Sequence, residues 1–78
     1  MQLAEATKLR ILGLLKEKKM KPFELSKAAG ISLPTLTDFM KGDTKNLRMD
    51  TILHICEGFN LTLKEFYDNE LFDDVISE

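Results

Sequence analysis

The stretch from Pro22 to Gly42, PFELSKAAGISLPTLTDFMKG, constrains the fold of this chain more than any other. Gly30 stands where a first short helix has to end, because glycine adopts the left-handed conformation of a helix C-terminus without steric cost. Ile31 can then fill the corner, and the hydroxyl of Ser32 can cap a second helix. Two short helices that cross steeply over a tight turn need this combination of residues. The stretch therefore predicts a helix-turn-helix motif.

Apolar residues recur at helical spacing along the rest of the chain, and no stretch alternates apolar and polar residues as a strand would. We predict an all-α fold of five helices, at about 3–18, 22–29, 33–41 and 49–59, with a fifth that begins at the capping box TLKE at 62–65. The second and third helices form the helix-turn-helix. The residues expected to face inward are Leu3, Thr7, Ile11, Leu14, Leu15, Leu25, Ala29, Ile31, Leu36, Phe39, Met40, Met49, Ile52, Leu53, Ile55, Cys56, Phe59, Leu63 and Phe66. This domain is expected at 1–68, followed by a short acidic and apolar tail at 69–78.

The 78 residues have room for one small domain, without a separate sensing or catalytic domain. One cysteine and one histidine cannot supply an internal disulfide or a structural zinc site. Helix packing or oligomerisation must therefore stabilise the domain. No apolar run approaches the roughly 18 residues of a membrane span. With no signal peptide recognisable, we expect a cytoplasmic protein in which a free thiol is normal.

Charge is divided unevenly along the chain. Residues 1–49 contain ten Lys and Arg against five Asp and Glu, a balance of +5, and residues 50–78 contain one against eight, a balance of −7; together these give the net −2. A binding surface responds to the local field more than to the total. A basic first part and an acidic second part are thus compatible with nucleic-acid binding.

The sequence contains no evident catalytic residues. His54 and Cys56 stand two positions apart on a predicted helix, about 200° around its axis, and cannot form a base–nucleophile pair. Apolar neighbours indicate that the Cys56 thiol is buried and inert. The acidic tail lacks the spacing and glycine of a calcium loop, and no glycine-rich phosphate loop occurs. We expect no enzyme, no metal, no cofactor and no small-molecule ligand.

The helical stretches resemble the Cro and repressor family of phage and bacterial regulators with lambda-repressor-like domains. The matching residues are Gly30-Ile31-Ser32, Thr35-Leu36, Gly42, Met49-Asp50-Thr51-Ile52 and Thr62-Leu63-Lys64-Glu65-Phe66, within a resemblance that covers about residues 5–68. The resemblance implies a five-helix DNA-binding domain and a sequence-specific transcriptional regulator. It also implies that the helix at 33–41 enters the major groove while the helix at 22–29 crosses the backbone.

Two groups of DNA-contacting residues follow from the resemblance. The positions that face the bases are Leu33, Pro34, Thr35, Thr37 and Asp38. The positions that serve the backbone are Lys21, Ser32, Lys41, Lys45, Asn46 and Arg48.

The chain departs from this family at two places. Many members begin the second helix with Thr-Gln or Ser-Gln, which grips a phosphate, whereas Lys21 and Pro22 stand here. The reading helix also lacks Arg, Asn and Gln, the side chains that best read guanine and adenine. Asp38 can accept a hydrogen bond from cytosine, but its charge also repels phosphate. A second hypothesis is therefore a protein-interaction, antitoxin or phage-accessory module that retains the fold with weak or no specific DNA binding.

The expected partners are double-stranded DNA and a second copy of the chain. A homodimer on a pseudo-palindrome doubles the few base contacts that one copy makes. Two candidate dimer surfaces stay open. One is formed by Leu9 and Leu12, and the other by Leu71, Phe72, Val75 and Ile76 of the tail.

Overall fold

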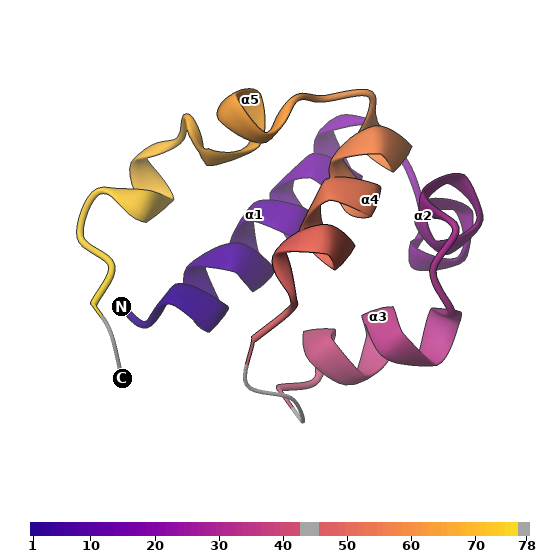
Figure 1. Cartoon of the computed structure of the whole chain (residues 1–78), viewed down its shortest axis with the longest axis horizontal. Helices are drawn as coiled ribbons and strands as arrows, with labels where there is room; N and C mark the ends of the chain where they lie inside the picture. The colour runs from indigo at the N-terminus through magenta and orange to yellow at the C-terminus, as the bar shows by residue number, and fades with distance from the viewer. Residues whose placement is uncertain (43–45, 77–78) are drawn as a thin grey trace.

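The computed structural model describes residues 1–42 and 46–76, which form a helical domain (Figure 1). Its elements are α1 (Leu3–Glu17), α2 (Pro22–Ala29), α3 (Leu33–Met40), α4 (Met49–Phe59), α5 (Leu63–Tyr67) and a short 3₁₀ helix, η1 (Glu70–Phe72). Within these two ranges there is no β-strand, and a single isolated bridge joins Gln2 to Ile76. The all-α prediction is confirmed, and each predicted helix is present to within a residue of its expected start.

Short-range hydrogen bonds define the ends of the helices, as the sequence predicts. Gly30 ends α2 with a φ of 70°, in the left-handed region. The hydroxyl of Ser32 accepts a hydrogen bond from the backbone N–H of Thr35 at 3.2 Å and so caps α3. The capping box of α5 is complete, because Thr62 and Glu65 bond to one another's backbone N–H groups at 3.1 and 2.9 Å.

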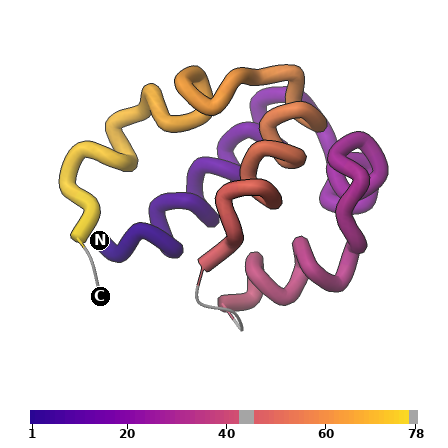
Figure 2. The backbone as a smooth tube through the Cα atoms, in the orientation of Figure 1, coloured from indigo at the N-terminus to yellow at the C-terminus, as the bar shows by residue number. Residues whose placement is uncertain are grey.

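The core is built from residues of all five α-helices, and α2 packs closely against both α4 and α3 (Figures 1 and 2). The largest fully buried side chains are Phe59, Phe66, Ile11, Leu25, Leu36, Ile55 and Cys56. The backbones of α2 and α4 approach closely at Gly58, where an added Cβ would lie 3.0 Å from the backbone nitrogen of Ala29. A glycine in the interior of α4 thus allows α2 to pack against it.

Three of the residues predicted to face inward are exposed instead. Leu3, Met49 and Leu53 are all on the surface, the last two with 57% and 42% of their area exposed. In α1 the buried residues are Ala6, Thr7, Ile11, Leu14 and Leu15, so the buried side of the helix begins at Ala6 and not at Leu3. In α4 the buried stripe is narrower than predicted, because the neighbouring helices cover only the side that carries Ile52, Ile55, Cys56 and Phe59.

The tail packs on its own domain. Phe72 of η1 lies against the rings of Tyr67 and Phe66, with centroids 4.8 and 6.1 Å apart. The backbone N–H of Ile76 donates to the carbonyl of Met1 at 3.1 Å, so both ends of the described chain lie together (Figure 2). The division between a domain at 1–68 and a tail at 69–78 stays a prediction. None of the helices described above is long and apolar enough to cross a membrane.

Candidate nucleic-acid interface

The outer side of α3 carries the five residues predicted to face bases. Pro34, Thr35 and Asp38 are exposed, whereas Leu33 and Thr37 are half-buried. The hydroxyls of Thr35 and Ser32 are 2.6 Å apart, so one of them donates to the other. The second hydroxyl hydrogen of this pair stays free for a base edge or a phosphate. The hydroxyl of Thr37 donates weakly to the carbonyl of Pro34, at 3.4 Å.

A hollow of about 340 Å³ separates α3 from the start of α4. Its lining comprises Pro34, Thr35, Asp38, Asn46, Leu47, Arg48 and Thr51. The structure thus brings three of the predicted base-facing residues together with two of the predicted backbone-facing ones. Lys21 and Lys41 are exposed but do not line this hollow, and Lys45 lies outside the described residues.

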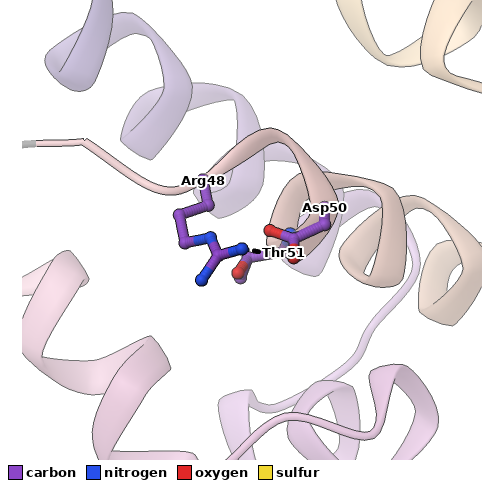
Figure 3. Close-up of polar contacts among 3 residues, drawn as sticks. All are labelled: Arg48, Asp50 and Thr51. Carbon is purple, nitrogen blue, oxygen red and sulfur yellow. Dashed lines mark hydrogen bonds and ion pairs between the residues drawn. The ribbon is translucent and has the colours of Figure 1, made fainter.

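Arg48 is held at the edge of this hollow by the carboxylate of Asp50, a residue of the family resemblance for which no contact with Arg48 was predicted. Its guanidinium lies 3.1 Å from Asp50, and the two side chains are 84% and 58% exposed (Figure 3). The other oxygen of Asp50 accepts the backbone N–H of Thr51 at 2.9 Å, in the first turn of α4. An ion pair this exposed contributes about 0.2–1 kcal/mol, so a phosphate can replace the carboxylate at little cost. The sequence signal for this ion pair was an arginine just before, and an aspartate just after, the first residue of the helix predicted at 49–59.

The charge of the hollow is nearly balanced. Asp38 and Arg48 both line it, and Asp50 pairs with the guanidinium from outside. A carboxylate in this position can accept from the amino group of cytosine, but it also weakens the attraction for phosphate. Among the described residues at the hollow, Arg48 is thus the single cation that could attract a DNA strand.

The start of α2 is closed by the chain's own carboxylate, at the place where the resemblance predicts a phosphate-gripping glutamine. The backbone N–H of Lys21 donates to Glu24 at 2.9 Å, and Pro22 begins the helix. One turn further, the Lys27 ammonium lies 5.1 Å from the centroid of the exposed Phe23 ring. The ammonium of Lys21 itself stays at the surface, where it can approach a phosphate as a point charge.

Comparison with known families agrees with this architecture. The model of the Cro/C1-type HTH DNA-binding domain matches residues 10–70, more than half of the chain. The chain belongs to this family. No curated protein and no solved structure gives a significant match. The prediction of a lambda-repressor-like, five-helix fold is thereby confirmed, with α2 and α3 as its helix-turn-helix and DNA binding as the general role of the family.

Cys56 and His54, the two side chains of this Cro/C1-type domain that were weighed as a base–nucleophile pair, do not form one. Cys56 is fully buried, and this burial raises the pKa of its thiol, although the charge of Arg10 partly opposes the shift. His54 is exposed on α4 and lies 3.4 Å from Glu57. The prediction that the thiol is buried is confirmed. Across the ranges that the structure describes, no cluster of three metal-binding side chains occurs.

Proposed function

We propose that this chain is a cytoplasmic transcriptional regulator of phage-repressor type, which binds double-stranded DNA sequence-specifically as a homodimer. In this proposal α3 enters the major groove and α2 crosses the backbone. The observation that carries it is the shared hollow, where Thr35 and Asp38 of the reading helix meet Asn46 and Arg48 from the segment before α4. Residues that read bases and residues that hold phosphates must lie this close together in a major-groove binder.

The proposed contacts fall into two sets. Base contacts come from Leu33, Pro34, Thr35, Thr37 and Asp38, and backbone contacts come from Lys21, Ser32, Lys41, Lys45, Asn46 and Arg48. Leu33 and the threonine methyls suit the methyl group of thymine, and Asp38 suits the amino group of cytosine. None of these side chains offers a bidentate contact to a purine, so one copy discriminates only modestly between bases. Binding of a second copy to the second half-site doubles the number of base contacts.

Arg48 is the strongest single test among the phosphate contacts. On binding, a phosphate replaces Asp50 as the partner of the guanidinium. Each such contact adds about 0.9 to the negative slope of log affinity against log salt. We expect Arg48→Ala to weaken binding to all sequences and to reduce the slope by about that amount.

The experiment is selection of duplexes from a random pool, followed by salt titrations on the enriched sequence. Thr37→Ala should change the preferred base at one position, whereas Arg48→Ala should lower affinity without changing the preference. Lys64→Ala is the matched control, because Lys64 is an exposed cation on α5. No enriched sequence, together with a salt slope near zero, would refute the proposal.

The balanced charge of the hollow favours the second candidate: an interaction, antitoxin or phage-accessory module with weak or no specific DNA binding. Asp38→Asn separates the two candidates, because it removes a negative charge and keeps the shape. If Asp38 reads cytosine, the variant loses preference at that base pair. If the carboxylate only repels phosphate, the variant binds all duplexes more tightly and the selectivity stays the same. If neither the wild type nor Asp38→Asn binds DNA in a salt-dependent manner, the interaction module is supported.

A further inference from the structure

The turn between α1 and α2 carries an excess of positive charge. Residues 16–27 contain five Lys against two Glu, a balance of +3. Four of these lysines are exposed and lie within six residues of chain, and we call them the lysine turn: Lys16, Lys18, Lys19 and Lys21. Among the described residues, no ion pair includes any of the four. Their charge is therefore available to an anionic partner.

The end of α1 does not need most of these ammonium groups. Backbone hydrogen bonds close the helix, since the N–H groups of Lys18 and Met20 donate to carbonyls of the last turn, both at 2.9 Å. One cation in that turn, Lys16, already complements the negative end of the helix dipole. Helix termination thus accounts for Lys16 and leaves the other three lysines without a structural role.

Lys19 occupies a backbone position that favours another residue type. Its φ of 55° lies in the left-handed region, where a side chain has a steric cost and glycine has none. The other positive-φ residues in the described ranges are Gly30, Gly42 and Asn60, which tolerate this conformation better. A lysine that lowers stability at an exposed turn indicates a function for its side chain.

We infer that the lysine turn is a second phosphate-binding site, centred on Lys19, which holds the DNA backbone outside the base pairs that α3 reads. The inference rests on the proposed function, in which α2 crosses the backbone and Lys21 contacts a phosphate. The eight residues of α2 separate its two ends by about 12 Å. That length corresponds to three or four base-pair steps of about 3.4 Å. The lysine turn therefore adds flanking base pairs to the footprint of α3.

This site supplies an attraction that the hollow at α3 lacks. Asp38 lines the hollow, and the charge of Arg48 is balanced by Asp50. Counterion release depends on how many phosphates are neutralised and not on the base sequence. The lysine turn thus contributes affinity, whereas α3 contributes selection. Glu17 lies within the same segment and weakens the attraction, so Glu17→Gln should tighten binding to every duplex.

Lys19→Gly separates binding from folding, because glycine suits the left-handed backbone at this position. We expect Tm to rise by about 4 °C. The affinity for a duplex enriched from the random pool should nevertheless fall, and the slope of log affinity against log salt should decrease by about 0.9. Asn60→Gly is the matched control, because Asn60 also has a positive φ and ends α4. It should leave the affinity and the slope unchanged. An unchanged slope in Lys19→Gly would overturn the inference.

Duplex length provides a test that changes only the DNA. The wild type should bind a duplex with about five additional base pairs at each end at least about fivefold more tightly than the enriched core alone. Lys18→Gln/Lys19→Gln should lose most of this preference. Lys8→Gln/Lys64→Gln removes two charges from elsewhere on α1 and from α5, and should retain it. Equal binding of both duplexes by the wild type, or the same preference in Lys18→Gln/Lys19→Gln, would refute a flanking site.

The inference and the proposed function can fail separately. Salt-dependent binding to all duplexes without an enriched sequence, with a smaller slope for Lys19→Gly, would support the lysine turn and refute sequence-specific regulation. Enrichment of one sequence, with equal slopes for the wild type and Lys19→Gly, would support the function and refute the lysine turn. Binding to phosphatidylserine vesicles but not to duplex DNA would refute both.

Discussion

Replacing Gly58 by alanine tests how closely α2 packs against α4, the contact that holds the helix-turn-helix on the core. The added Cβ would lie 3.0 Å from the backbone nitrogen of Ala29, 3.1 Å from the Cβ of Ala29 and 3.1 Å from a methyl group of Leu25. The leucine methyl can rotate away, but the backbone of α2 can make room only if the helix moves. We therefore expect α2 to shift outwards or the helix packing to weaken.

The magnitude follows from two opposing effects. Alanine in a helix interior is favoured over glycine by about 0.8–1 kcal/mol. Extra atoms in a tightly packed core cost about 1–3 kcal/mol. At Gly13, on the exposed side of α1, an added Cβ has nothing within 4 Å, so Gly13→Ala receives the helical gain without the packing cost. The difference in unfolding free energy between the two variants therefore isolates the packing cost, about 1–3 kcal/mol.

Thermal and urea unfolding followed by far-ultraviolet circular dichroism measure this difference. For a domain of this size, 1 kcal/mol corresponds to about 4–8 °C in Tm. We expect Gly13→Ala to melt above the wild type and Gly58→Ala to melt at least about 4 °C below Gly13→Ala. Equal melting temperatures for the two variants would show that α2 does not depend on the absence of a side chain at Gly58.

Three further predictions concern residues outside the proposed DNA-facing surface. Arg10→Met should lower the unfolding free energy by about 2 kcal/mol, because the guanidinium donates to the carbonyls of Phe66 and Glu65 at 2.7 and 3.0 Å; urea unfolding measures it. The backbone N–H of Thr62 lowers the pKa of Glu65 from its usual 4.5, so its stabilisation is present above pH 4.5 and lost as pH falls through the lower folded value. Glu65→Gln should remove that part of the acid dependence of the urea midpoint. The Cys56 thiol, whose pKa burial raises, should react with a thiol reagent only as fast as the protein unfolds.

Local features of the helix-turn-helix could be predicted because each depends on residues a few positions apart. The left-handed glycine at Gly30, the cap at Ser32 and the capping box from Thr62 to Glu65 all form within one turn of chain. The composition of α3 is equally local, so its lack of purine-reading side chains was evident before its position was known. The glycine inside α4 was itself a signal, since a helix-interior glycine often has a packing reason, but the sequence did not say which helix it approaches.

The tertiary structure decided which faces are covered and which distant groups meet. Arg10 finds its acceptors more than fifty residues away, and Thr35 and Asp38 share a hollow with Arg48 only because α4 starts beside α3. Periodicity placed Met49 and Leu53 on the inward-facing side of α4, yet both are exposed in the structure. Local sequence therefore determined where each helix begins and ends, since short-range hydrogen bonds set those limits. The exposure of Met49 and Leu53 and the hollow at Arg48 were decided by the arrangement of complete helices, which depends on contacts between segments far apart in the chain.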